Sequence, residues 1–148
     1  MANIIPFSFR GALFSGQHDF QASGGNTFKL SLYVGGGTFP YTTASTVYSA
    51  TDEVSSGGGS NYAIKTLTNN GVASGTAVAS VDFANVTWSS ATFSAAYAAI
   101  YNSDTVDSTA NRLVVVLDFG GAKTATNGDF TITFPDPATP ANAIISMS

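Results

Sequence analysis

Apolar and polar residues alternate along several stretches of the chain. The alternation covers Phe28 to Tyr33, Tyr62 to Lys65, Ala77 to Phe83 and Asp129 to Phe134. A period of two places every second side chain on one face, which is typical of a β-strand with one buried face. Turn-forming clusters between these stretches, such as Asn69-Asn70-Gly71 and Gly120-Gly121, leave little room for long helices. The pattern therefore predicts short strands that share one core.

Two further stretches depart from this simple alternation. The run from Leu113 to Leu117 is apolar at every position, which indicates a central strand covered on both faces. The segment from Phe93 to Tyr101 fits two periods, because its aromatic residues recur at helical spacing while its odd-numbered residues also alternate. We predict a strand there, since the polar residues 102–110 can form a hairpin loop that leads directly into the central strand.

These elements predict an all-β fold, a single antiparallel β-sandwich with jelly-roll-like connectivity, over residues 21–148. A last short strand is expected from Ala143 to Met147, after three prolines at 135, 137 and 140 interrupt the chain. Residues 1–20 show no clean period, and they contain four phenylalanines and two glycines. We therefore expect an extended N-terminal arm before the sandwich.

Charge restricts the classes of partner. Charged residues make up 9% of the 148 residues, against about 25% in a typical domain. Five Lys and Arg against nine Asp and Glu offer no basic patch for nucleic acid or an anionic membrane. No stretch reaches the ~20 apolar residues of a membrane span. A surface with so few repelling charges is poorly protected against association, so we expect it to pack against neighbouring proteins.

Candidate catalytic residues are few. The chain has no cysteine and one histidine, which excludes thiolate metal sites and cysteine nucleophiles. His18 lies next to Asp19 and near Ser15, but adjacent residues of an extended chain point apart, which disfavours a catalytic triad. Paired carboxylates for glycoside cleavage would have to come from Asp52 and Glu53 or from Asp residues distant in the sequence. Glu53 is the sole glutamate, and nothing around it suggests the apolar burial that raises the pKa of a catalytic acid. We expect no enzymatic activity and no cofactor.

The richest candidate for a metal site is the run from Asn102 to Asp107. It lacks the glycine and the terminal glutamate of an EF-hand loop. Asn and Asp side chains also stabilise turns by bonding to the backbone two residues further on. We therefore interpret the run as a hairpin loop and expect no metal.

Aromatic residues leave a second function open. Trp88, six tyrosines and threonine-rich strands could present a face on which sugar rings stack. A single tryptophan in a sandwich is more often part of the core or of a subunit interface. We keep a receptor-binding module that recognises a host glycan through such a face as the alternative hypothesis.

Six stretches, taken in order and spacing, resemble a family of small virion proteins of tailed bacteriophages, known as head decoration, cement or fibre-associated proteins. The resemblance spans most of the chain and rests on Ala12–Phe20, Asn26–Tyr33, Asp82–Ser89, Ala98–Asn102, Val116–Gly121 and Gly128–Pro135. One departure is the alanine-rich run at 95–99, where related sequences carry more polar residues.

The resemblance implies a non-enzymatic structural protein on the outer capsid surface, made in the host cytoplasm. Its implied partners are the major capsid protein and copies of itself, often as a trimer, whereas the alternative places the chain in a tail fibre. Because the first twenty residues are rich in phenylalanine, we expect them to reach the partner. The candidate contact residues are Phe7, Phe9, Phe14, His18 and Trp88.

Overall fold

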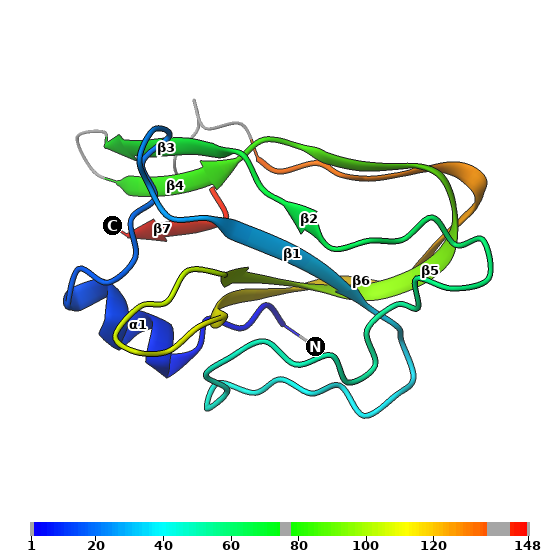
Figure 1. Cartoon of the computed structure of the whole chain (residues 1–148), viewed down its shortest axis with the longest axis horizontal. Helices are drawn as coiled ribbons and strands as arrows, with labels where there is room; N and C mark the ends of the chain where they lie inside the picture. Colours follow the sequence, from blue (N-terminus) through cyan, green and yellow to red (C-terminus); the bar gives the residue numbers. More distant parts are fainter. Residues whose placement is uncertain (1, 75–77, 136–142, 148) are drawn as a thin grey trace.

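The computed structural model describes residues 2–74, 78–135 and 143–147. Within them lie one helix and seven strands: α1 (Phe7–Phe14), β1 (Phe28–Tyr33), β2 (Lys65–Thr66), β3 (Asn69–Ser74), β4 (Ala79–Phe83), β5 (Val86–Asn102), β6 (Arg112–Ile132) and β7 (Ile145–Met147). The strands form two antiparallel sheets, in the orders β2-β1-β5-β6 and β3-β4-β7, which pack together (Figure 1). The antiparallel β-sandwich is confirmed, whereas jelly-roll connectivity stays a prediction.

The two longest strands, β5 and β6, turn back on themselves at one end of the molecule (Figure 1). The rings of Phe119 and Phe130, both on β6, lie 6.4 Å apart, although a straight strand would separate them by roughly 36 Å. The β5–β6 register shifts in this region, and Gly120 and Gly121 have φ angles of 70° and 138°. The glycine pair therefore forms an irregularity within one bent strand instead of the expected turn, because glycine adopts these angles at little cost.

Most of the predicted strands are confirmed. β1 matches the alternating stretch from Phe28, and β5 includes all of residues 93–101, so that segment is a strand and not a helix. The polar residues that follow it connect β5 to β6. β7 is shorter than the expected strand that began at Ala143, and residue 77 of the predicted fourth strand lies outside the described residues.

Two expectations about strands are wrong. Of the strand predicted from Tyr62 to Lys65, only Lys65 is in a strand. The Tyr62 hydroxyl accepts a hydrogen bond from the backbone N–H of Leu32, 3.0 Å away, and so holds this connecting segment against β1. The turn-like sequence from Asn69 to Gly71 lies in β3. A register irregularity between these two residues accommodates the glycine within that strand.

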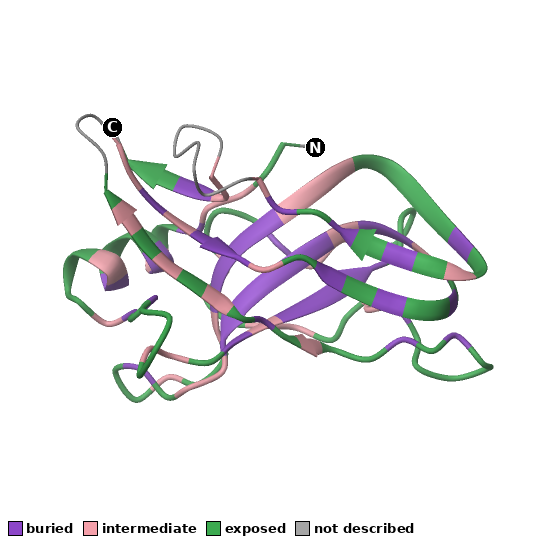
Figure 2. Ribbon diagram, turned by 90° about the horizontal axis from the view of Figure 1, so that it is seen from above, coloured by how far each residue is buried: buried purple, intermediate pink, exposed green. Residues whose placement is uncertain are grey.

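The core fills the space between the two layers. Its fully buried members include Phe28, Leu30 and Leu32 of β1 and Trp88 and Ile100 of β5, and Figure 2 shows the middle of the long strands buried. A second cluster, with Tyr33, Tyr41 and Leu113, covers the opposite face of the four-stranded sheet. Residues 113–116 are all buried, so the prediction of a strand covered on both faces is confirmed. Its predicted central position is wrong, because β6 lies at the edge of the four-stranded sheet and pairs with β5 alone among the strands.

Residues 1–20 pack against the sandwich. Residues 7–14 form α1, and Phe20 stacks on Phe28 with ring centroids 4.4 Å apart. The backbone of Ile4 exchanges two hydrogen bonds with that of Val116, at 2.9 and 2.8 Å. The expectation of an extended conformation is therefore wrong for α1, and these contacts tie its flanking residues to the four-stranded sheet. In the part of the chain that the structure describes, no helix is long and apolar enough to cross a membrane.

Candidate functional site

The structure separates the five candidate contact residues into two groups. Phe7 and Phe14 are 61% and 87% exposed, whereas Phe9, His18 and Trp88 are at most 7% exposed. The buried three have almost no surface to offer a partner in this conformation, so we correct their assignment to interior packing. The exposed pair lies on α1, so this helix carries the candidate contact residues that remain accessible.

The ends of α1 are set by local backbone chemistry. Pro6 precedes its first residue, and Gly16 follows its last turn with a φ of 67°. The N–H of Gly16 donates to the carbonyl of Leu13 at 3.1 Å, and the N–H of Gln17 donates to that of Ala12 at 2.9 Å. This pair of bonds is a Schellman motif, which satisfies carbonyls left over at a helix end. Proline before a helix and glycine after it are sequence signals that could have predicted α1.

α1 is apolar on two opposite faces. Phe9 and Ala12 face the core and are 1% and 3% exposed. The outer face of α1, defined by Phe7, Arg10, Gly11 and Phe14, is exposed at every position, and Arg10 is the helix's single charged residue. Spacings of three, four and seven residues place these four on one stripe. Two exposed phenylalanines on one stripe of a helix form an apolar patch of the kind that often marks an interaction surface.

A groove runs between α1 and β7. It contains two hollows of about 230 and 240 Å³, and both are walled by Phe9, Leu13, Ile145 and Met147. The larger one opens beside Phe14, and Met147 on its rim is 54% exposed. The groove extends the outer face of α1 into a continuous apolar surface.

His18 lies at one wall of this groove. Its Nδ1 is 3.0 Å from the side-chain nitrogen of Asn102, and the rings of Phe9 and Phe20 have centroids 5.0 and 6.2 Å from its own. Burial, together with the nearby positive charge of Arg112, lowers the pKa of His18 to about 4. The imidazole is therefore neutral at neutral pH and is packed among aromatic rings.

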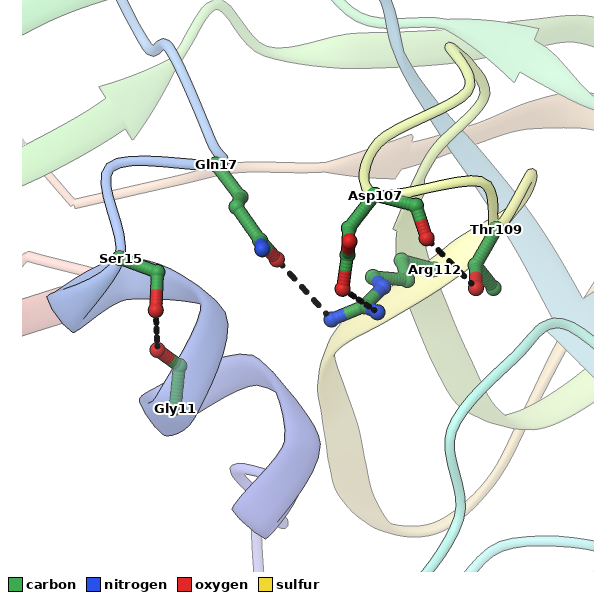
Figure 3. Close-up of polar contacts among 6 residues, drawn as sticks. All are labelled: Gly11, Ser15, Gln17, Asp107, Thr109 and Arg112. Carbon is green, nitrogen blue, oxygen red and sulfur yellow. Dashed lines mark hydrogen bonds and ion pairs between the residues drawn. The ribbon is translucent and has the colours of Figure 1, made fainter.

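Arg112, the first residue of β6, links the segment after α1 to the β5–β6 connection (Figure 3). Its guanidinium donates a hydrogen bond to the side-chain oxygen of Gln17 at 3.3 Å and pairs with the Asp107 carboxylate at 3.5 Å. The Asp107 side chain is 63% exposed, so this ion pair adds little stability by itself. The contacts nevertheless fix the C-terminal end of α1 relative to the four-stranded sheet.

The residues considered for a hydrolase are not brought together. The Ser15 hydroxyl donates to the Gly11 carbonyl at 3.2 Å (Figure 3), and the Asp19 carboxylate accepts from the Gln21 N–H at 2.9 Å. The imidazole of His18 contacts Asn102 instead of either residue. The geometry of a triad, with serine and carboxylate on opposite ring nitrogens, is therefore not formed.

Glu53 has a different environment from a catalytic acid. Its carboxylate accepts hydrogen bonds from the hydroxyls of Tyr48 and Tyr62. Burial and these bonds raise the pKa of both tyrosines, because an ionised phenol would face a carboxylate. Through Tyr62, which also accepts from Leu32, the cluster attaches the connection between β1 and β2 to the sheet.

The run from Asn102 to Asp107 forms the hairpin loop that its sequence predicted. The N–H of Asp104 donates to the side-chain oxygen of Asn102 at 3.0 Å, and the Asp104 carboxylate accepts from the Thr27 N–H at 2.9 Å. These bonds stabilise the loop in the manner of an Asx turn. Among the described residues, no group of three or more His, Asp or Glu side chains could hold a metal ion.

The aromatic residues proposed for sugar stacking lie inside the molecule. Trp88 is 1% exposed, and its indole N–H donates to the Ala63 carbonyl at 2.7 Å. None of the six tyrosines is exposed, because four are buried and Tyr48 and Tyr97 are half-buried. Phe39, whose ring lies beside that of Tyr97, is also half-buried. The hypothesis of a glycan site built from these rings therefore has no open face to support it.

Comparison with protein families, with curated proteins and with solved structures gives no match. The function must therefore be argued from the residues of this chain.

Proposed function

We propose that this chain is a non-enzymatic structural protein of a virus particle, which binds the outer capsid shell and stabilises neighbouring capsid subunits. The observation that carries the proposal is the outer face of α1, an apolar helix face left exposed beside an apolar groove. The resemblance to virion decoration proteins supplies the kind of partner. The chain would be made in the host cytoplasm and act on the virion surface.

Burial of the outer face of α1 against the shell gives the free energy of docking. Phe7 and Phe14 are 61% and 87% exposed, and complete burial of a phenylalanine is worth about 2 kcal/mol. The hollow beside Phe14, about 240 Å³ in volume, can also receive an apolar side chain from the partner. These contributions concentrate the binding energy in a small central patch, as in most protein interfaces.

Charge favours a shell protein over a second copy at this face. Arg10 is the one charged residue of α1 and lies over the Phe7 ring, with its guanidinium carbon 5.3 Å from the ring centroid. A two-fold contact between two such helices would place like charges together without a carboxylate from either helix. An apolar shell surface that carries an aspartate or glutamate would complement it. The proposed trimer would therefore form through other surfaces of the chain.

The low fraction of charged residues in the whole chain agrees with this role. Charged residues are 9% of the sequence, and small uncharged polar residues take their place. Such a surface is suited to a protein that is covered by neighbours, since few charges must be desolvated when it associates.

The test is co-sedimentation of the purified chain with expanded capsid shells that lack it. We expect saturable binding, and we expect Phe14→Glu to weaken it at least about tenfold, since a buried phenylalanine is worth more than the 1.4 kcal/mol of a tenfold change. Val34→Glu is the matched control, because Val34 is also exposed, at 37%, but lies outside α1 and its groove. Near-ultraviolet circular dichroism should show that both variants remain folded.

Two results would contradict the proposal. Equal binding by Phe14→Glu and the unmodified chain would exclude the outer face of α1 as the docking surface. Gold-labelled antibody against the chain should mark the head of intact particles; label on the tail alone would favour a fibre protein, and unlabelled particles would remove the virion assignment.

A further inference from the structure

One hydrogen bond of fixed direction joins the segment after α1 to the end of β5. The side-chain oxygen of Asn102 accepts a hydrogen bond from the Asp104 N–H at 3.0 Å, which sets the orientation of the amide. The amide nitrogen therefore donates to the side-chain oxygen of Asn26 and to Nδ1 of His18, each at 3.0 Å. Because Nδ1 must accept this bond, the imidazole is neutral and its proton resides on Nε2.

Protonation of His18 is incompatible with this arrangement. An imidazolium donates from both ring nitrogens, so its Nδ1 would face the Asn102 nitrogen as one donor against another. Nε2 is buried and makes no hydrogen bond with the described residues, so the second N–H also has no acceptor. A buried charge whose N–H groups are both unbonded is strongly disfavoured.

The charged groups around His18 do not compensate for the added charge. Burial and then the positive charge of Arg112, at the start of β6, lower the pKa of His18, and the carboxylate partner of Arg112, on Asp107, is largely exposed. The Asp19 and Asp104 carboxylates accept hydrogen bonds from other groups and not from the imidazole. The residues of β3, β4 and β7 that line the hollow beside His18 have no titratable side chain.

α1 is held to the sandwich by polar contacts near its two ends. Ile4 bonds to the backbone of β6 on the N-terminal side, and Gln17 and His18 make side-chain hydrogen bonds on the C-terminal side. Between these ends Phe9 is buried, but hollows of about 230 and 240 Å³ beside it leave the helix incompletely packed against β7. The charged residue of the helix, Arg10, lies on its exposed face and offers no carboxylate. Segments with few buried apolar contacts are those that open locally.

We propose that α1 is an acid-sensitive latch, in which protonation of His18 releases the helix and residues 15–18 from the sandwich while the strands stay folded. The latch is closed at neutral pH, where the imidazole accepts from Asn102. Its release would uncover the core-facing side of Phe9 and the groove beside β7. The proposal goes beyond the suggested role in a virion and does not depend on it.

Single cysteines can report the release, because the chain has none of its own. Ala12→Cys places a thiol on the core-facing side of α1, where Ala12 is 3% exposed. Ala98→Cys is the matched variant in β5, where the alanine is 0% exposed. The rate of reaction of each full-length variant with dithiodipyridine, which modifies thiols in acid, is measured between about pH 7 and pH 4 and divided by the rate for free cysteine. Near-ultraviolet circular dichroism at neutral pH should show that each variant is folded.

The pKa of His18 sets the size of the expected effect. It is about 4 when the latch is closed and returns to 6.5 when the latch is open, so the open state takes up the proton first as the pH falls. The population of the open state, and with it the relative rate for Ala12→Cys, should rise about a hundredfold by about pH 4. Ala98→Cys should stay protected. Adding His18→Gln to Ala12→Cys should remove the rise, since glutamine does not titrate.

Three outcomes would overturn the proposal. Equal exposure of both thiols in acid would show that the whole chain unfolds and that α1 does not open alone. A relative rate for Ala12→Cys that is unchanged at about pH 4 would show that the helix stays closed. A rise that persists with His18→Gln would assign the acid sensitivity to a carboxylate, such as that of Asp104.

Discussion

At the scale of the residue, His18 shows how burial changes the role of a reactive side chain. In the sequence it is the sole histidine and lies near a serine and an aspartate, which suggests chemistry or partner contact. In the fold its ring lies among phenylalanines and faces an asparagine. The same burial makes the folded protein resist protonation of this side chain.

The free energy of unfolding should therefore depend on pH through His18. Its pKa falls from 6.5 to about 4 on folding, so above pH 6.5 the imidazole is neutral in both states and stability is complete. As the pH falls from 6.5 towards 4, the unfolded state takes up the proton first, and up to about 3 kcal/mol of stability is lost. Urea unfolding measured across this range should show the loss.

A His18→Gln variant provides the control for this prediction. The variant has the same carboxylates as the unmodified chain. The difference between the two curves of unfolding free energy against pH therefore gives the contribution of the histidine alone. The glutamine variant should show a flatter dependence between pH 6.5 and 4. Parallel curves would contradict the assigned pKa.

At the scale of the element, α1 illustrates how end signals can be overlooked when periodicity is weak. Its apolar residues occur on both faces, so no amphipathic pattern reveals the helix. The bounding Pro6 and Gly16, by contrast, are visible in the sequence and act locally. The helix is short and has no side-chain cap at its N-terminus, so tertiary packing must supply much of its stability.

Substitution of glycine within α1 should stabilise the protein. A Cβ added at Gly11 meets nothing within 4 Å, and alanine is favoured over glycine in a helix interior by about 1 kcal/mol. We expect Gly11→Ala to raise the urea midpoint accordingly. Gly25→Ala is the matched contrast, because its Cβ would lie 2.8 Å from the Gln21 nitrogen and 2.9 Å from the Asp19 oxygen, both backbone atoms.

The two glycine substitutions should shift the urea midpoint in opposite directions. Gly25→Ala should lower the midpoint, since crowding against backbone cannot be relieved by rotating a side chain. A midpoint raised by Gly25→Ala would contradict the close packing of the loop after α1, and a midpoint lowered by Gly11→Ala would contradict the open space at that helix position.

At the scale of the whole molecule, tyrosine hydroxyls join the long connection between β1 and β2 to the sandwich. Tyr33 and Tyr41 have hydroxyls 2.7 Å apart, and the Tyr33 hydroxyl donates to the Ser49 carbonyl at 2.8 Å. With the bonds of Glu53 to Tyr48 and Tyr62, these contacts anchor a connection that has little regular structure of its own. Without such hydrogen bonds, a long connection with little regular structure is often disordered.

This arrangement predicts a loss of stability in alkali. Burial raises the pKa of five tyrosines, to about 12 for Tyr101, from an ordinary value of 10.0. Below pH 10 both states are protonated and stability is unaffected, whereas above pH 10 the unfolded state ionises first and stability falls. Ultraviolet difference spectra at about pH 11 should show fewer ionised phenols in the folded chain than in the chain unfolded by concentrated guanidinium.

The outcome at about pH 11 is informative in either direction. Ionisation of all six tyrosines with the near-ultraviolet circular dichroism unchanged would mean that the hydroxyl network is open to solvent. Ionisation coincident with loss of the circular dichroism signal would agree with the buried arrangement.

The sequence alone determined the class of fold, because a period of two and frequent turn formers are local properties of the chain. It also determined the strand at 113–117, whose unbroken apolar run requires cover on both faces, and the polar loop after residue 102. The sparse charge, a matter of composition, predicted a surface suited to association. Each of these features depends on composition or on residues close together in the chain.

Tertiary structure decided which of the candidate residues remain accessible. Phe7, Phe9 and Phe14 are alike in sequence, but packing of α1 against the sheet buries the second and exposes the other two. The bend of β5 and β6 encloses Trp88, and the contact of His18 with Asn102 joins residues 84 positions apart. Burial and long-range contacts depend on how distant segments meet, so no local pattern specifies them.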